Sequence, residues 1–163
     1  MTERLNGKKI LIVDDEPDVL EALCELLDMC VIDYARNFET AERLLKENAY
    51  DAAILDIMGV KGYDLLQLAR VRDVPALMLT AHALSPDQLV KSMKGGAFSY
   101  IPKEEMVDIA FYLDDAIQAK LKGDRKSQNW FRKVSSVFDK KFGSGWQIKH
   151  KKALKDFDLT HSR

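Results

Sequence analysis

The chain has 163 residues, of which 47% are hydrophobic, and its formal net charge at pH 7 is −1. This length suits one ordinary domain with a small appendage, and the apolar content excludes wholesale disorder. No apolar run approaches the roughly 20 residues that span a bilayer, and the first apolar run is too short for a signal peptide. We therefore expect a cytoplasmic protein.

The charges are unevenly distributed along the chain. Residues 1–121 hold 13 Lys/Arg and 22 Asp/Glu, a net charge of −9, whereas residues 122–163 hold 12 and 4, a net charge of +8. Such a split indicates two segments with different roles. We predict one domain over residues 1–121, and a basic linker, an amphipathic helix and a tail over residues 122–163.

The first part of the chain alternates apolar runs with helical patterns. The run at 8–14 predicts a strand, and Pro17 is tolerated in the first turn of the helix that follows. Leucines recur at helical spacing as far as Leu27. A second strand is expected at 31–35, and Asn37 is a plausible N-cap for the second helix.

The third and fourth strands are predicted to end on polar residues. Apolar runs lead to Asp56 and to Thr80, with a short helix around Leu65 between them. Gly59 and Gly62 make the loop after Asp56 conformationally permissive.

The clearest local signal is a capping box at the start of the fourth helix. Ser85 is expected to cap this helix, Pro86 to take its first position and Gln88 to reach back to the cap. Gly95-Gly96 is expected to end the helix.

A fifth strand is predicted at 98–101, ended by Pro102, and a fifth helix is predicted to run to Leu121. Unbroken apolar strands suit a parallel sheet that helices cover on both faces. Five strand–helix units in this order predict an α/β fold with a doubly wound, five-stranded parallel sheet.

Polar side chains follow four of the predicted strands. Asp14 and Asp15 end the first, Asp56 the third and Thr80 the fourth, while Lys103 follows the fifth. The carboxyl ends of parallel strands share one edge of the sheet, where ligands bind. We therefore expect these side chains to lie together.

The residue types in this cluster suit phosphoryl chemistry. Clustered carboxylates are ligands for Mg²⁺, which leaves room for phosphate oxygens. A lysine can pair with a phosphate, and a threonine hydroxyl can hydrogen-bond it. A carboxylate can also act as a nucleophile and form an aspartyl-phosphate. Each residue alone has commoner roles in caps and turns; their combination favours phosphoryl transfer.

These motifs resemble the receiver domain of two-component response regulators. The matching segments are residues 12–17, 54–56, 79–81 and 100–103, and the resemblance covers residue 8 to about residue 121. It implies a flavodoxin-like sheet in the strand order 2-1-3-4-5, followed here by a C-terminal helical extension.

The resemblance also implies the acceptor and its metal. Asp56 would accept a phosphoryl group from the phosphohistidine of a histidine kinase or from a phosphotransfer protein. Mg²⁺ would be the cofactor, held by Asp14, Asp15, Asp56 and the backbone carbonyl of Met58.

Three further roles follow from the resemblance. Lys103 would contact the phosphoryl group, and Thr80 and Tyr100 would form a switch pair that changes partner binding. The chain would then be a phospho-acceptor rather than an enzyme, limited to self-phosphorylation from small donors and slow autodephosphorylation. The downstream partner is not indicated.

The loop after the acceptor departs from the family pattern. Family members usually carry Pro four residues after the acceptor and Gly eight residues after it. Here Val60 occupies the Pro position, and Gly62 comes six residues after Asp56. The loop is therefore two residues shorter. Nearby, His82 is interpreted as a partly exposed loop residue rather than a general base.

An amphipathic helix is predicted over residues 127–142. Trp130, Val134 and Phe138 share one face of it, and Gly143-Ser144-Gly145 is expected to end it. This face is expected to pack on the first domain or on a second copy, giving a possible homodimer. A membrane-surface helix and a weak nucleic-acid contact are the alternatives. The residues after the glycines are expected to fray.

Two other functions stay open at this point. A hydrolase of the haloacid dehalogenase type also uses an aspartyl-phosphate and Mg²⁺, with its nucleophile in an Asp-x-Asp pattern after the first strand. Asp14 does not start such a pattern, because position 16 is Glu16. The other is a DNA-binding or membrane-surface regulator that acts through its basic tail, although no strong signal for nucleic acid or membrane is present.

Overall fold

The computed structural model describes residues 2–57, 60–81, 84–127, 129–157 and 159. Its centre is a five-stranded, fully parallel sheet in the order β2-β1-β3-β4-β5, which confirms the predicted fold and strand order. The strands are β1 (Lys9–Val13), β2 (Val31–Ala35), β3 (Ala52–Asp56), β4 (Ala76–Thr80) and β5 (Ser99–Pro102).

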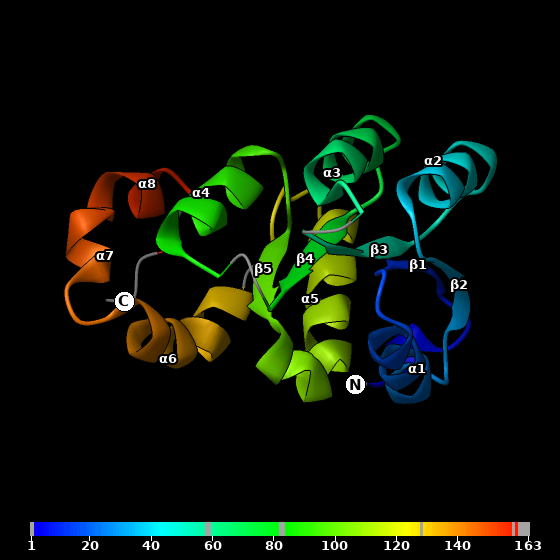
Figure 1. Cartoon of the computed structure of the whole chain (residues 1–163), viewed down its shortest axis with the longest axis horizontal. Helices are drawn as coiled ribbons and strands as arrows, with labels where there is room; N and C mark the ends of the chain where they lie inside the picture. Colours follow the sequence, from blue (N-terminus) through cyan, green and yellow to red (C-terminus); the bar gives the residue numbers. More distant parts are fainter. Residues whose placement is uncertain (1, 58–59, 82–83, 128, 158, 160–163) are drawn as a thin grey trace.

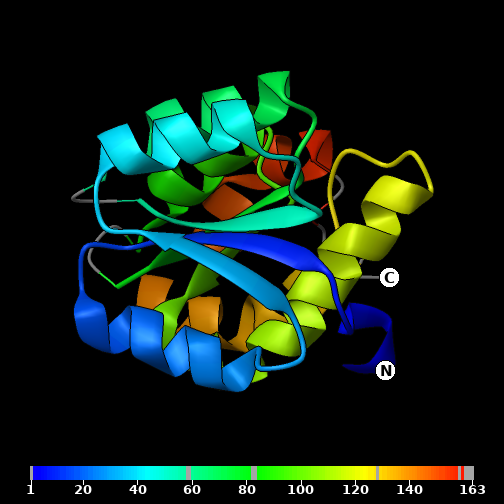
Figure 2. The same ribbon diagram turned by 90° about the vertical axis from the view of Figure 1, so that its right-hand side faces the viewer.

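Helices cover both faces of this sheet. Figure 2 shows α1 and α5 on one face and α2, α3 and α4 on the other. The elements are η1 (Thr2–Leu5), α1 (Pro17–Leu26), α2 (Phe38–Glu47), α3 (Gly62–Val71), α4 (Pro86–Lys94), η2 (Lys103–Asp108) and α5 (Ile109–Leu121). Every residue of β3 and β4 is therefore buried. This is why their sequences are continuous apolar runs rather than alternating patterns.

The helix caps follow the sequence in part. The Thr40 amide donates to the Asn37 side chain over 2.9 Å, which confirms that cap. The Gln88 amide likewise donates to Ser85 Oγ over 3.1 Å. The second half of the predicted capping box is wrong, because the Ser85 amide donates to the Tyr100 hydroxyl instead, over 3.1 Å.

Residues 122–163 form the C-terminal extension, and the part of it that the structure describes is more ordered than the sequence predicts. The predicted helix is present as α6 (Trp130–Phe142), and Gly143 ends it with a φ of 86°. Two short helices follow, α7 (Trp146–Lys149) and α8 (Lys151–Asp156). The expected fraying is wrong for this stretch, because Trp146 and Leu154 are buried among apolar side chains.

The extension packs on the chain's own sheet. Trp130, Val134 and Phe138 are fully buried, as predicted for a face that contacts protein. In Figure 1, α6, α7 and α8 lie beyond β5 and beside α4. The membrane-surface alternative needs this stripe exposed, so its burial argues against it. No helix in the described part of the chain is long and apolar enough to cross a membrane.

The connection between α5 and α6 is also held in place. The Ser127 amide donates to the Phe98 carbonyl over 3.0 Å, and the Asn129 amide donates to the Asp115 carboxylate over 3.1 Å. Buried side chains of both parts join one apolar cluster. The division into residues 1–121 and 122–163 stays a prediction.

Candidate functional site

The sheet register brings the predicted site residues to one edge. Val13 pairs with Leu55 and Asp56 pairs with Leu79, so the ends of β1, β3 and β4 lie level. Thr80 in turn pairs with Pro102, the residue before Lys103. The carboxyl ends of four strands therefore deliver Asp14, Asp15, Asp56, Thr80 and Lys103 to the same place.

Lys103 is the centre of this group. Its Nζ lies 2.8 Å from Glu16 Oε1, 3.1 Å from Asp14 Oδ2 and 3.8 Å from Asp56 Oδ1. Glu16 was not predicted to take part. The signal available in the sequence was a third acid directly after Asp14 and Asp15, on the turn into α1.

Three acids form a carboxylate cluster beside the lysine. One oxygen from each of Asp14, Asp15 and Glu16 can be chosen so that all three lie within 4.8 Å of one another. Asp14 Oδ1 accepts a hydrogen bond from the Glu16 amide over 2.9 Å. Asp14 Oδ2 is buried, lies 3.1 Å from the Lys103 ammonium and accepts no hydrogen bond from the other described groups. A buried carboxylate oxygen in this state fits a cation as its partner.

The predicted metal ligands are therefore only partly gathered by this geometry. Asp14 and Asp15 lie in the carboxylate cluster, whereas Asp56 is linked to it through Lys103. The backbone carbonyl of Met58 lies outside the described residues, as do Gly59 and His82.

The electrostatics of the site follow from burial. Burial and the neighbouring Asp14 charge raise the pKa of Asp56 to about 7, although Lys103 opposes the shift. Burial also raises the pKa of Asp14. For Lys103 burial alone would lower the pKa, but its contacts with Glu16 and Asp14 raise it overall. The site thus holds more negative charge than one lysine neutralises, which is the condition under which a divalent cation binds.

The predicted switch residues are both buried. Thr80 ends β4, and Tyr100 points into the protein from β5 with no exposed surface. Met78 pairs with Tyr100, so the two predicted switch residues sit two positions apart along neighbouring strands. The Tyr100 hydroxyl accepts a hydrogen bond from the backbone amide of Ser85, the N-cap residue of α4.

Gly62, the first residue of α3, lies directly against the end of β3. The Gly62 amide donates to the Ile57 carbonyl over 3.2 Å. A Cβ atom at position 62 would lie 2.2 Å from the backbone oxygen of Asp56, which no side chain allows. Val60 is buried. Gly62 therefore lets the short loop bring α3 against the acceptor strand.

Comparisons with known proteins point to a single family. The family model for the response regulator receiver domain matches residues 10–110. This segment contains all of the predicted site residues. It ends within α5 and excludes the C-terminal extension.

Characterised relatives agree with this match. The response regulator protein PilR of Pseudomonas aeruginosa is 35% identical over 105 residues, which cover 61% of this chain and 23% of PilR. The transcriptional regulatory protein TcrA of Mycobacterium tuberculosis is 32% identical over 114 residues, which cover 66% of this chain and 45% of TcrA. The matched segment is thus less than half the length of either relative.

Solved structures share the fold. A response regulator receiver domain from Clostridium thermocellum has a TM-score of 0.62 and 29% identity, over 69% of this chain and 96% of that chain. A CheY-like receiver domain from Methanospirillum hungatei has a TM-score of 0.65 at 22% identity, over 72% of this chain and 99% of that chain.

Proposed function

Because the chain belongs to the response regulator receiver family, we propose that it takes a phosphoryl group from a histidine kinase or a phosphotransfer protein onto Asp56. One observation carries this proposal. Asp56 is a buried carboxylate at the end of the central strand β3, with a lysine ammonium 3.8 Å from its Oδ1. Phosphotransfer would make the chain a signalling module.

The transfer step is a displacement at phosphorus. An Asp56 carboxylate oxygen attacks the phosphorus of the donor phosphohistidine, the P–N bond breaks, and the imidazole nitrogen leaves with the electron pair. The nucleophile has to be ionised, so its raised pKa must fall in the working complex. Lys103 lies where it can neutralise the transferred group, and Thr80 can donate a hydrogen bond to one of its oxygens.

We propose Mg²⁺ as the cofactor of this step. Asp14, Asp15, Asp56 and the Met58 carbonyl would hold it, and the carboxylate cluster with the buried Asp14 Oδ2, which already lies 3.1 Å from the Lys103 ammonium, fits a hard cation. When bound, it supplies charge neutralisation for the acids and the incoming phosphoryl oxygens.

The output is proposed to be a change in partner binding. Thr80 and Tyr100 would shift a pre-existing equilibrium when Asp56 is phosphorylated. We propose no enzymatic activity beyond self-phosphorylation from small donors and slow autodephosphorylation. A homodimer and the cytoplasmic location stay predictions.

DNA binding is a second candidate. TcrA is a transcriptional regulatory protein by name, but the matched segment spans only 45% of it. A DNA-binding role for this chain would have to use its own basic extension. Binding of duplex DNA that falls steeply with salt would support this candidate.

The proposed function is tested by mass spectrometry of the intact chain. With acetyl phosphate and Mg²⁺, the mass should rise by one phosphoryl group, and Asp56→Asn should prevent this. Asp64→Asn is the matched control, because the Asp64 side chain is exposed in the first turn of α3. Labelling that persists in Asp56→Asn would refute the assignment.

A further inference from the structure

The segment Ser99–Asp108, which comprises β5 and η2, contacts both the candidate site and the C-terminal extension. At the start of η2, Lys103 Nζ lies 3.1 Å from Asp14 Oδ2. Three residues earlier, the Tyr100 ring packs against Phe138 of α6, with 5.8 Å between ring centroids. One short segment therefore carries both Lys103, which belongs to the site, and Tyr100, on which the extension packs.

Two ion pairs attach η2 to α6. Lys141 Nζ lies 3.0 Å from Glu104 Oε2, and Lys133 Nζ lies 3.4 Å from Asp108 Oδ2. All four side chains are partly exposed, so each pair contributes modestly to docking. Their positions matter more, because Glu104 directly follows Lys103. A displacement of η2 would therefore move Glu104 and Asp108 together with Lys103.

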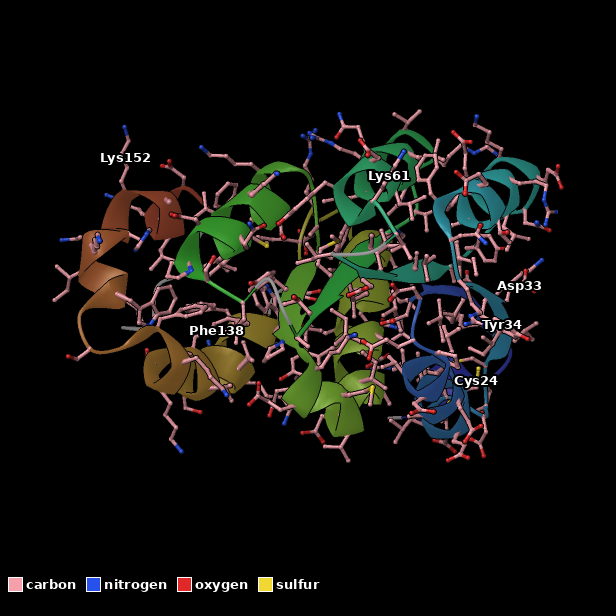
Figure 3. All side chains as sticks on the ribbon, viewed as in Figure 1. Cys24, Asp33, Tyr34, Lys61, Phe138 and Lys152 are labelled. Carbon is pink, nitrogen blue, oxygen red and sulfur yellow. The ribbon has the colours of Figure 1, made fainter. Side chains whose placement is uncertain are left out.

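Phe138 is the residue of the extension that packs against Tyr100. It is fully buried and lies on the inner side of α6 (Figure 3). Its ring centroid lies between 5.1 and 6.3 Å from those of Phe142, Trp146, Phe131 and Trp130, all in the extension. Phe138 thus connects the aromatic core of the extension to Tyr100.

Tyr100 also connects to the start of α4. Its hydroxyl accepts the Ser85 amide hydrogen bond over 3.1 Å, and Ser85 lies five residues after Thr80. The extension contacts the same helix end, where His150 Nε2 lies 3.6 Å from Asp87 Oδ1. The strands β4 and β5 therefore continue into α4 and η2, and the extension contacts both of these elements.

We infer that the C-terminal extension is an intramolecular ligand of the Tyr100 face and that its docking is coupled to occupancy of the Asp56 site. This inference rests on the proposed function, because its effector is a phosphoryl group or a mimic at Asp56. The docked extension keeps Tyr100 buried. It also holds η2 in the position where Lys103 contacts Asp14 and Asp56. It therefore favours the arrangement that receives the phosphoryl group.

Such coupling is reciprocal. If docking strengthens binding at Asp56, then occupancy of Asp56 strengthens docking by the same factor. Loosening the extension should accordingly weaken binding at Asp56. A merely structural extension would leave that affinity unchanged.

The test uses the full chain, Mg²⁺ and beryllofluoride, a non-covalent phosphoryl mimic. Amide NMR signals of the site report its affinity, and the indole signals of Trp130 and Trp146 report the extension. These are the only tryptophans in the chain. Saturation with beryllofluoride should shift both indole signals in wild type. It should shift neither signal in Asp56→Asn.

Phe138→Ala is the main variant. It removes the ring that packs on Tyr100 without substituting any site residue, so the affinity for beryllofluoride should fall about fivefold or more. A dispersed spectrum of the sheet amides shows that the receiver fold is intact.

A charge-matched pair of double variants supports the main test. Lys133→Gln/Lys141→Gln removes both ion pairs to η2 and should weaken binding about twofold. Arg132→Gln/Lys140→Gln makes the same charge change on the same helix, at exposed positions with no ion-pair partner among the described residues. It should leave the affinity unchanged.

The outcomes separate this inference from the proposed function. If wild type does not bind beryllofluoride at Asp56, both are overturned. If wild type binds but Phe138→Ala and the first double variant bind equally well, the coupling alone is overturned. Should Phe138→Ala fail to fold, the comparison of the two double variants decides.

Discussion

At the scale of single residues, the acceptor carboxylate is an unfavourable group for the fold. Asp56 has its pKa raised from 3.8 to about 7 by burial and by the charge of Asp14. The folded state therefore binds this proton more tightly than the unfolded state does. Above pH 7 the ionised carboxylate destabilises the fold; this cost decreases as pH falls from 7 to about 4 and is absent below the unfolded pKa.

Asp56→Asn should therefore stabilise the metal-free protein in a pH-dependent way. With a chelator present, we expect a higher free energy of unfolding at pH 8, by at most about 4 kcal/mol, since the pKa rises from 3.8 to about 7 on folding. The gain should shrink steadily toward pH 4. Urea unfolding across this range measures it, with Asp64→Asn as control. A gain that is constant with pH would contradict this account.

At the scale of elements, the junction between β3 and α3 depends on one glycine. Alanine at Gly62 would place its Cβ against the backbone of Asp56 and Ile57, and backbone cannot move aside as a flexible side chain can. We expect Gly62→Ala to lower the free energy of unfolding by about 2 kcal/mol or more. Gly95→Ala is the comparison, because its Cβ would meet mainly the Leu66 side chain. Equal stability of the two variants would show that the backbone of the short loop can shift to accommodate a Cβ atom at position 62.

The sequence predicted those elements whose signals are local or periodic. The apolar strands, the Asn37 cap and the edge that gathers Asp56 and Lys103 all follow from strand ends and spacing. Contacts between distant segments were not predicted. Glu16 beside Lys103 depends on how the turn after β1 meets the start of η2. Likewise, the second half of the capping box failed because a tyrosine from another strand took the Ser85 amide.

At the scale of the whole molecule, opposite net charges meet where the extension docks on the acidic part of the chain. The charges at this contact are nevertheless mostly exposed: the Lys133–Asp108 and Lys141–Glu104 pairs have side chains between about one third and one half accessible. Such pairs are screened by salt and contribute up to about 1 kcal/mol each. The buried ring of Phe138 is different, since burying a large apolar side chain contributes roughly 1.5–3 kcal/mol and does not depend on screening.

Docking of the extension should therefore survive high salt. We expect the amides of α6 to stay protected from hydrogen exchange when NaCl is raised to about 1 M, where the Debye length is only about 3 Å. Phe138→Ala should lose much of this protection at low and high salt alike, because it removes packing rather than charge. The Lys133→Gln/Lys141→Gln variant should resemble wild type at high salt, where its missing ion pairs are already screened. Loss of wild-type protection on adding salt would instead mean that charge attraction between the basic extension and the acidic domain holds α6 in place.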